Sequence, residues 1–353
     1  MTIAIPAEAL TDVCAGIFAR VGSSPEEARA VAASLVDSNL TGHDSHGVIR
    51  VPRYVAWVKS GDLVANQSLA ALTDAPSFAV LDGRFGFGQI MAPRAVDIGI
   101  AKAQALGLAA VSLRNSGHVG RVGEWAERAA VAGLISIHFV NAAGSILVAP
   151  FGGLERRLST APFCVGAPRK GAPPLILDFA TSLVAEGKVR VAAQGGKALP
   201  GDALIGPEGE LSGDPAQLYG PPGENALGDH SRGLGAIRAF GEHKGSGLAL
   251  ICELLGGSLT GNGATEPDRK FANGMFSLYI DPLRIDPSHV FDADMARYLK
   301  WFSAAKPIPG QEILTPGEPE RRARAQRLAS GVPLPQEVWD SIQATAREVG
   351  ATV

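Results

Sequence analysis

The alternation of helical and strand-like segments after residue 90 is the feature that most constrains the fold. Residues 92–106 show the apolar spacing of a helix, and Gly107 is placed to end it. An apolar run over 108–113 is typical of a buried strand, and a helical segment at 123–132 follows it. Segments that alternate in this way are typical of an α/β protein.

Other periodic segments extend this pattern in both directions along the chain. Ser24 and Pro25 followed by Glu27 have the spacing of a capping box, which predicts a helix from Pro25 to about Leu40. A stretch rich in Gly, Pro and Asp over 194–235 shows little periodicity and predicts either an ordered excursion or loops. The remaining expected elements are helices at 7–20 and 246–259, strands at 134–140, 175–179 and 275–280, an arginine-rich helix around 321–327, and a final helix after Pro335.

Length and charge narrow the class of protein further. A chain of 353 residues is long for one hydrophobic core, so we expect two or three lobes. Its formal net charge of −3 gives no overall attraction to nucleic acid or to anionic lipid, and neither is an expected partner. The sequence contains no long uninterrupted apolar run, so no membrane-spanning helix is expected.

The cysteines and the N-terminus indicate the compartment. Cys14, Cys164 and Cys252 are widely spaced and odd in number, which argues against a disulfide framework and favours a reducing environment. Residues 1–6 contain neither a basic region nor an apolar region of the kind that directs secretion. We therefore expect a cytoplasmic protein.

The glycine-rich segments do not match the standard nucleotide-binding motifs. Residues 86–88 and 233–235 each have the form G-x-G but lack the third glycine of G-x-G-x-x-G. Residues 240–248 place a lysine before small residues at a helix start, but without the G-x-x-x-x-G-K-[ST] spacing. If a dinucleotide binds here, a scaffold other than the Rossmann fold must hold it.

The first segment with chemical potential is G-H-D-S-H-G-V-I-R at 42–50, directly after a predicted helix. Its two histidines have no third metal ligand nearby, so a metal site is disfavoured. His43 and Asp44 could simply cap the helix and bond the turn. His46, on a turn that ends in glycine, could exchange a proton near neutral pH. Arg50 could bind a carboxylate in a bidentate manner, or form a surface ion pair.

Two further glycine-rich turns lead into predicted helices. The turn at 114–123 would present free N–H groups at a helix start, and Arg121 would add positive charge, so it is a candidate pyrophosphate site. A purely structural turn explains the same residues equally well. At 240–248, Lys244 at the start of an apolar helix has the physical character of a phosphate site.

Polar residues elsewhere have weaker signals. Asp178 follows an apolar strand and could hydrogen-bond a ribose or an amide, or cap the next segment. His138 lies within an apolar strand, where we expect a core histidine with satisfied hydrogen bonds. His230 and His289 have no informative neighbours in sequence and are expected at the surface.

Taken together, these segments resemble the malate/L-lactate dehydrogenase family, whose members lack a Rossmann fold. Residues 132–140 and 149–151 are similar to the hydroxycarboxylate dehydrogenase subgroup. Residues 159–162 depart from the family pattern, because Ala161 stands where Asn is usual. The resemblance covers residues 8–350. The blocks that carry it, in the family's order, are G-H-D-S-H-G-V at 42–48, N-S-G-H-V-G at 115–120, D-F-A-T-S at 178–182, E-H-K-G-S-G at 242–247, and P-G-E-P at 316–319 with G-V-P-L at 331–334.

The resemblance implies a particular architecture. The fold would be α/β and non-Rossmann, with a large, mostly antiparallel sheet surrounded by helices and a helical lobe formed by the N- and C-terminal parts. Residues 1–120 would form the helical and substrate-site lobe, 121–284 the cofactor-binding domain, and 285–353 a segment that packs on the first lobe. The resemblance also implies a homodimer.

The chemistry of the site is implied in the same way. The family moves a hydride between NAD or NADP and a small 2-oxo or 2-hydroxy acid, with His46 as the acid–base residue and Arg50 near the substrate carboxylate. His118 would lie beside the nicotinamide and is the second candidate for the proton transfer. The implied cofactor contacts are His46, Gly120, Arg121, Val122, Ile176, Leu177, Asp178, Phe179, Ala180, His243, Lys244, Asn273, Gly317, Glu318 and Pro319.

Alternative functions stay open at this point. A cyclic-imine reductase acting on piperideine- or pyrroline-2-carboxylate would use the same site on a C=N bond, and ureidoglycolate dehydrogenases belong to the same family. A nucleotide-binding protein without catalysis is a third alternative, but the joint presence of His46, Arg50, His118 and Lys244 argues against it. The residues discriminate neither between NAD and NADP nor between individual acids.

Overall fold

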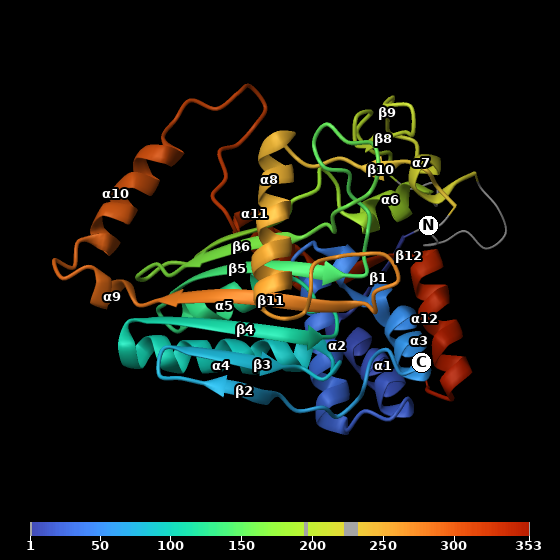
Figure 1. Ribbon diagram of the computed structural model, residues 1–353, viewed down its shortest axis with the longest axis horizontal. Helices are drawn as coiled ribbons and strands as arrows, with labels where there is room; N and C mark the ends of the chain where they lie inside the picture. Colours follow the sequence, from blue (N-terminus) through green and yellow to red (C-terminus); the bar gives the residue numbers. More distant parts are fainter. Residues whose placement is uncertain (1, 194–196, 222–231, 353) are drawn as a thin grey trace.

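A seven-stranded sheet forms the centre of the molecule (Figure 1). Its strands, in spatial order, are β2 (Ala70–Asp74), β3 (Phe78–Asp82), β4 (Leu108–Ser116), β11 (Ala272–Ile280), β5 (Ile135–Ala143), β6 (Pro162–Ala167) and β7 (Leu175–Ala180). The computed structural model describes residues 2–193, 197–221 and 232–352. Within this sheet β3 and β4 run parallel, and every other neighbouring pair is antiparallel. The predictions of an α/β fold and of a large, mostly antiparallel sheet are therefore confirmed.

The central strand of the sheet comes from late in the chain. β11 pairs with β4 on one side and with β5 on the other, over almost its whole length. The strand that completes the sheet therefore follows β5, β6 and β7 in sequence but lies between β4 and β5 in space. The sheet also runs through the boundary expected at 120/121, because β4 precedes that point and β11 follows it.

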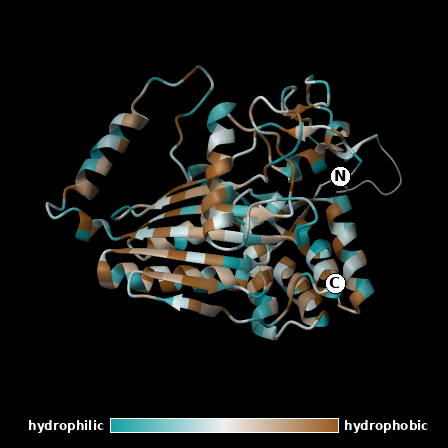
Figure 2. Cartoon of the chain, viewed as in Figure 1, coloured by the Kyte–Doolittle hydropathy of each residue, from teal (hydrophilic) through white to brown (hydrophobic). Residues whose placement is uncertain are grey.

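Helices lie on both faces of the sheet (Figure 1). α4 (Gly88–Leu106) and α5 (Val122–Val131) cover one face, and α8 (His243–Cys252) crosses the other. Hydrophobic residues run along the strands between these layers (Figure 2). Contact between α4 and β11 is very close at Gly99, where a Cβ would lie 2.2 Å from Cε2 of Tyr279. Only a glycine lets the helix approach the sheet to this distance.

The N- and C-terminal parts of the chain pack together beside the sheet (Figure 1). Strand β1 pairs with β12 in antiparallel register, which joins the two ends directly. The buried apolar faces of the helices continue into the core of the main sheet. The elements involved are β1 (Thr2–Ile5), α1 (Ala7–Arg20), α2 (Pro25–Leu40), α3 (Val51–Ser60), α11 (Glu318–Ser330), β12 (Val332–Pro335) and α12 (Gln336–Val349).

A second, smaller hydrophobic cluster includes part of the stretch 194–235. Its described residues include Leu204, Leu218 and Ile237, each fully buried. They belong to short elements that pack as a unit above the main sheet in Figure 1. These elements are α6 (Glu186–Ala193), β8 (Leu204–Ile205), β9 (Leu211–Ser212), α7 (Ala216–Tyr219) and β10 (Ala236–Ile237). The described part of 194–235 is therefore an ordered excursion, one of the two predicted alternatives, and its strands are too short to show a period.

Helix ends follow local signals in part. Ser24 caps α2 by accepting a hydrogen bond from the Glu27 amide at 3.2 Å, as predicted. The reciprocal half of the capping box is wrong, because the Glu27 carboxylate accepts from Ser23 and Asn66 instead. The helix predicted at 246–259 begins earlier and changes at Glu253 into a π-helix that ends at Leu259. None of the described helices is both long and apolar enough to cross a membrane.

Several elements had no clear signal in the sequence. They are α3, β2, β3, β6, α9 (Pro282–Ile285) and α10 (Phe291–Ser303). The last of these stands away from the rest of the molecule in Figure 1, and none of its residues is buried. Tyr298 and Trp301 on this helix are 51% and 68% exposed. An aromatic helix in this position has no partner within the described chain.

Replacement of Gly99 by alanine should destabilise the protein by about 1–3 kcal/mol, because the new methyl group overlaps the ring of Tyr279. The matched control is Gly16→Ala in α1, where a Cβ meets nothing within 4 Å. That change should stabilise the helix by about 0.5–1 kcal/mol, since alanine loses less backbone entropy than glycine. Urea unfolding of both variants measures the difference, and equal effects would contradict the close approach.

Candidate active site

Two histidines from distant parts of the chain form a stacked pair. Nδ1 of His46 lies 3.2 Å from Nε2 of His118, and the two rings are nearly parallel with centroids 5.2 Å apart. His46 ends a short helical turn, Asp44–His46, that follows α2. His118 lies in the loop that follows β4. The structure therefore brings together the two candidates for the proton transfer, which are 72 positions apart in the sequence.

The turn that carries His46 is held from both sides. Asn39, at the end of α2, accepts a hydrogen bond from the Val48 amide at 2.8 Å and donates one to Asp44 at 2.6 Å. Arg327 of α11 also donates to Asp44, at 2.6 Å. Gly47 packs so tightly on Asn39 that a Cβ would lie 2.1 Å from its Oδ1. Asp44 therefore bonds the turn through the side chains of Asn39 and Arg327 and, among the described residues, makes no capping hydrogen bond to the backbone at the end of α2.

The loop that carries His118 is anchored to the central strand. Oδ1 of Asn273, in β11, accepts a hydrogen bond from the Val119 amide at 2.9 Å, and its Nδ2 donates to the Asn141 carbonyl at 2.8 Å. The Gly117 amide donates to the Gly86 carbonyl at 2.8 Å. Both ends of the Asn273 amide group thus help to join β5, β11 and the His118 loop. Asn273 stays a predicted cofactor contact, and its first role is to place His118.

Two residues that the sequence reading missed extend the pair. The hydroxyl of Tyr54, in α3, lies 2.6 Å from Nδ1 of His118. Nε2 of Gln89, in α4, donates a hydrogen bond to that hydroxyl at 3.0 Å. One signal was present: Tyr54 follows Arg50 by four positions, and helical spacing puts both on the same face. Gln89 had no signal, because a single glutamine in a helix is ordinary.

The surroundings keep the pair uncharged. Burial, and to a smaller extent the positive charge of Arg50, lowers the pKa of His46 to about 3. Burial and Arg50 also hold the pKa of His118 well below its usual value. Burial raises the pKa of Tyr54 to about 12. The free site therefore holds two neutral imidazoles and a neutral phenol at neutral pH.

Arginine side chains gather next to the histidines. Nε of Arg50 donates to the Ser45 carbonyl at 2.7 Å, and its Nη2 lies 3.9 Å from the carboxylate of Glu186 in α6. Arg190, one turn further along α6, lies 3.3 Å from the same carboxylate. Arg53 is close enough to both arginines that their charge, together with burial, lowers its pKa. Arg50 is therefore more than a surface ion pair, since its side chain is only 21% exposed and borders the histidines.

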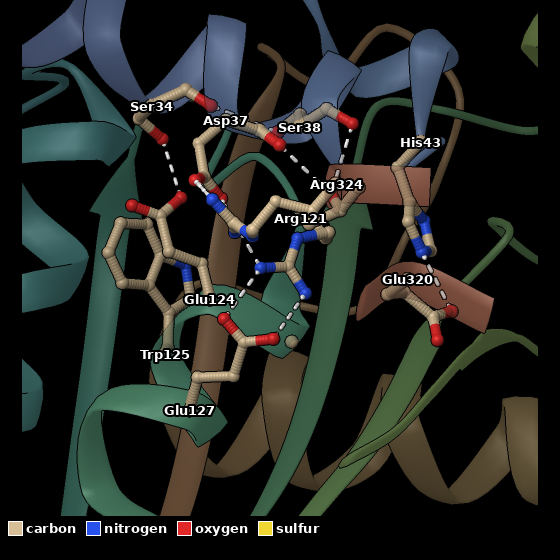
Figure 3. A network of polar contacts seen from close by, with 12 residues as sticks. Ser34, Asp37, Ser38, His43, Arg121, Glu124, Trp125, Glu127, Glu320 and Arg324 are labelled. Carbon is tan, nitrogen blue, oxygen red and sulfur yellow. Dashed lines mark hydrogen bonds and ion pairs between the residues drawn. The ribbon is translucent and has the colours of Figure 1, made fainter. Parts of the chain in front are cut away.

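Arg121 does not face an open anion site. Its side chain is fully buried and lies 3.0 Å from Glu127 and 3.4 Å from Asp37 (Figure 3). Burial alone would lower the pKa of Arg121, but Glu127, Asp178 and Asp37 together raise it above its usual value. Arg324 of α11 donates to Asp37 at 2.5 and 2.9 Å. The sequence predicted that the charge of Arg121 would face a pyrophosphate. In the structure the carboxylates of Asp37 and Glu127 already neutralise that charge.

The start of α5 is occupied by a side chain. Oδ2 of Asp178, in β7, accepts a hydrogen bond from the Gly123 amide at 2.7 Å. Asp178 thus caps a helix, as one interpretation of the sequence suggested, but the helix is α5 rather than the next segment in sequence. The carboxylate would also repel a phosphate at this turn. The structure therefore favours the structural interpretation of 114–123, and contacts from the Gly120 and Val122 backbone to a cofactor stay a prediction.

Other predicted cofactor residues meet at the edge of the sheet. The Ile176 amide in β7 donates to the Pro316 carbonyl at 3.3 Å, which places Gly317 against the strand. A Cβ on Gly317 would lie 3.2 Å from the Ile176 nitrogen, so glycine is needed there. This contact joins the predicted segment Ile176, Leu177, Phe179 and Ala180 to the predicted segment Gly317, Glu318 and Pro319.

His243 and Lys244 form a separate part of the surface. Both are exposed at the start of α8, and the ring of His243 lies 6.0 Å from that of Phe151. Neither makes a hydrogen bond or ion pair with His46, Arg50 or His118 in the described part of the chain. The N-cap residue of this helix is Glu242, but its side chain makes no capping hydrogen bond within the described ranges, unlike Asp178 at the start of α5, and Lys244 carries an exposed ammonium group.

The remaining histidines have structural positions. His138 is fully buried and bonds Ser277 at 2.8 Å and Ser136 at 3.0 Å, which confirms the prediction of a core histidine. His43 lies 3.3 Å from Glu320. His289 is exposed, as expected, and His230 lies outside the described residues. No group of three or more His, Cys, Asp or Glu side chains in the described ranges has the arrangement of a metal site.

Ala161, the departure from the family pattern, has an unusual backbone. It is fully buried and has a φ of 29°, a region that side chains other than Asn and Asp rarely adopt. The asparagine usual in the family would adopt this conformation more easily. Ser159 compensates by accepting a hydrogen bond from the Ala161 amide at 3.2 Å.

Comparison with known proteins agrees with this geometry. The family model described as malate/L-lactate dehydrogenase matches residues 5–343. Hydroxycarboxylate dehydrogenase B of Escherichia coli (strain K12) is 39% identical to this chain over 351 residues, which cover 98% of this chain and 94% of that protein. The family resemblance seen in the sequence blocks is confirmed.

Solved structures give the same result for the fold. Malate dehydrogenase from Pyrococcus horikoshii OT3 aligns with a TM-score of 0.85 at 28% identity, over 99% of this chain and 97% of that one. The delta1-piperideine-2-carboxylate reductase from Pseudomonas syringae pvar. tomato aligns with a TM-score of 0.79, also at 28% identity, over 98% of this chain and all of that one. The similarity therefore extends over the whole length of both relatives.

Proposed function

Because the chain belongs to the malate/L-lactate dehydrogenase family, we propose that it interconverts a small 2-oxo acid and its 2-hydroxy acid with NAD or NADP. The observation that supports this most is the neutral His46–His118 pair beside Arg50. A buried neutral imidazole can exchange a proton with a substrate oxygen, and an arginine beside it can hold the carboxylate of the same molecule. When bound, the nicotinamide supplies or accepts the hydride.

His46 has the better position of the two histidines for the proton transfer. Both ring nitrogens of His118 face protein groups, since Nε2 faces His46 and Nδ1 faces Tyr54. In His46 only Nδ1 is used in this way among the residues that the structure describes, and Nε2 lies outside the pair. We assign the exchange of the proton with the substrate oxygen to Nε2 of His46. His118 holds the ring of His46 in place, which supports the order of preference suggested by the sequence.

The charge around the pair suits an acidic substrate. Arg50, Arg53 and Arg190 contribute three positive charges, and Glu186 contributes one negative charge. Nε of Arg190 is buried without a hydrogen-bond partner among the described residues. A substrate carboxylate bound between these arginines would form ion pairs with them in place of their contacts with water, which stabilises the bound acid.

The described residues fit a dinucleotide at two places. Lys244 offers an exposed ammonium group at the start of α8, and backbone N–H groups at a helix start suit a phosphate. Gly317 lies against Ile176 and has no side chain, so a ligand could approach the backbone closely at the edge of β7. We propose that Lys244 and His243 hold phosphate groups and that the Ile176–Gly317 contact borders the rest of the cofactor.

We also propose that the protein forms a homodimer. α10 exposes Tyr298 and Trp301. Leu250 and Ile251 of α8 are 53% and 42% exposed, and Leu254 of the π-helix that follows is 45% exposed. In Figure 1 α10 stands apart from the body, with no element of its own chain over it. A soluble protein rarely leaves apolar groups of this size in water, so a second copy is the occupant we propose.

The direct test is an assay of the purified full chain with NADH and NADPH against a panel of substrates. We expect oxidation of at least one reduced cofactor with a 2-oxo acid, and the panel should include monocarboxylic and dicarboxylic members. A cyclic 2-imino acid tests the alternative C=N reduction, and ureidoglycolate with the oxidised cofactors tests the other family reaction. Binding of cofactor without turnover of any substrate would contradict the proposal and favour a nucleotide-binding protein.

His46→Ala should lower kcat by about 10²–10⁴-fold, because it removes the group that exchanges the proton. The variant should still bind cofactor, which fluorescence titration of NADH or NADPH measures. The matched control is His289→Ala, which removes an exposed histidine outside the site. Wild-type turnover in the His46 variant would show that another residue carries the proton.

Substitution of both Tyr298 and Trp301 by glutamate should convert the dimer into a monomer, because charge is then placed on the apolar face of α10. Sedimentation velocity measures the mass. Val131→Glu is the control, since Val131 is 84% exposed on α5 and lies on another surface. A wild-type protein that sediments as a monomer at micromolar concentration would overturn the proposal.

A further inference from the structure

Four side chains form one continuous hydrogen-bonded chain that begins at the histidine pair. Its links are His46 Nδ1 to His118 Nε2 at 3.2 Å, His118 Nδ1 to the Tyr54 hydroxyl at 2.6 Å, and that hydroxyl to Gln89 Nε2 at 3.0 Å. We call these four residues the relay. Gln89 is 3% exposed and Tyr54 is 1% exposed, so water does not compete for the bond between them.

The bond that Gln89 makes to Tyr54 determines which group is the donor and which the acceptor in every other hydrogen bond of the relay. The Gln89 amide donates to the Tyr54 oxygen, so the phenol proton is free to go to His118. Nδ1 of His118 is then an acceptor, and a neutral His118 must carry its proton on Nε2, which faces His46. Nδ1 of His46 is an acceptor in turn. The single proton of neutral His46 therefore lies on Nε2, the nitrogen outside the relay.

This direction does not suit proton exchange at Nε2 of His46. To take a proton from a hydroxyl, Nε2 must be bare, so the neutral ring must carry its proton on Nδ1. To give a proton without becoming an anion, the ring must start as a cation, with a proton on each nitrogen. In both cases Nδ1 of His46 is a donor. His118 must then accept at Nε2 and donate from Nδ1 to the Tyr54 oxygen.

The reversed direction requires an acceptor for the Tyr54 proton, and Gln89 contains one. Oε1 of Gln89 is buried and has no hydrogen-bond partner among the described residues. A half-turn of the amide would bring this oxygen to the position from which Nε2 now donates. Each of His46, His118 and Tyr54 then still carries one proton, so the reversal moves protons within the relay and none enters or leaves. An amide is the neutral side chain that can serve both directions.

We propose that Gln89 and Tyr54 are positioning residues that determine, through His118, which nitrogen of His46 carries the proton. The catalytic form of the relay is the reversed one, in which Tyr54 donates to Oε1 of Gln89 and His46 donates to His118. Oε1 of Gln89, which has no hydrogen-bond partner among the described residues, is the acceptor that this form requires. The proposal rests on the proposed function in that His46 is taken as the residue that meets the substrate.

Charged groups around the relay are few and fixed by the fold. His46 faces Arg50, His43, Arg121 and Glu186 besides His118. Gln89 and Tyr54 add no charge of their own, because the phenol stays neutral. A change at Gln89 therefore reaches His46 through hydrogen bonds rather than through a new ion pair in the pocket, unless the change itself introduces a charge.

Two substitutions at Gln89 separate the directions of the relay. Gln89→Glu introduces an acceptor at the end of the relay and should fix the reversed direction once the carboxylate ionises. Gln89→Met has nearly the same shape without a strong acceptor, and it should leave Tyr54 donating to His118. Nitrogen NMR of protein with ¹⁵N-labelled histidine reads the tautomers directly. We expect a proton on Nε2 of both histidines in the wild type and in Gln89→Met, and on Nδ1 of both in Gln89→Glu.

The pH profile of kcat/KM for 2-hydroxy acid oxidation, in which neutral His46 accepts the proton, provides a second measurement. Activity falls as His46 gains a proton at low pH, so this fall should occur at higher pH in Gln89→Glu, by about one pH unit, and at lower pH in Gln89→Met. kcat in Gln89→Met should fall by about 10²-fold, and KM should change little. Gln104→Glu is the control, because it adds the same charge at an exposed position of α4.

Tyr54→Phe removes the middle link and keeps the measurement informative if either Gln89 variant folds poorly. Combined with Gln89→Glu it should cancel the tautomer change, because the carboxylate no longer reaches His118. Unchanged tautomers in Gln89→Glu, or pH shifts of equal sign in both Gln89 variants, would overturn the relay. Failure of the proposed function has a different signature: no 2-oxo acid is reduced, while the tautomers still report on the relay.

Discussion

The fully buried guanidinium of Arg121 holds together three parts of the chain that are far apart in sequence. It lies between Asp37 of α2 and Glu127 of α5, and Arg324 of α11 shares Asp37 (Figure 3). Removal of one partner from such a cluster leaves a buried charge without compensation, at a cost of about 3–5 kcal/mol. The cluster therefore permits little rearrangement between the N-terminal helices, the sheet and the C-terminal helix.

This constraint determines where the site forms. The turn that carries His46 directly follows α2, and α11 holds the same turn through Arg327 and Asp44. His118 follows β4 and is fixed to β11 by Asn273. The histidine pair thus spans the junction between the terminal helices and the sheet, and its geometry depends on elements that share no local sequence.

Local signals explain which parts of the structure the sequence could predict. Ser24 and Gly107 mark helix ends because capping depends on a few neighbouring residues, and His138 was recognised by its apolar neighbours. The sequence could not predict that the Arg121 side chain pairs with Asp37 and Glu127, because these residues come close to it only after the chain folds. Tyr54 and Gln89 were not predicted as site residues, because the hydrogen bonds that connect them to His118 also form only after the chain folds. The family blocks indicated His46 and His118 separately, whereas their contact depends on the sheet and on α2 together.

The position of β11 has a consequence for how the chain reaches its native state. β4 and β5 each pair with this strand, and it leaves the ribosome only after most of the chain has been made. Until then two long apolar strands each present an unpaired edge, the kind of surface from which aggregation starts. Closure of the sheet is a late, long-range event, which slows folding relative to proteins built from local contacts. Synthesis of this protein should therefore depend more on chaperones than the ordinary appearance of its sequence suggests.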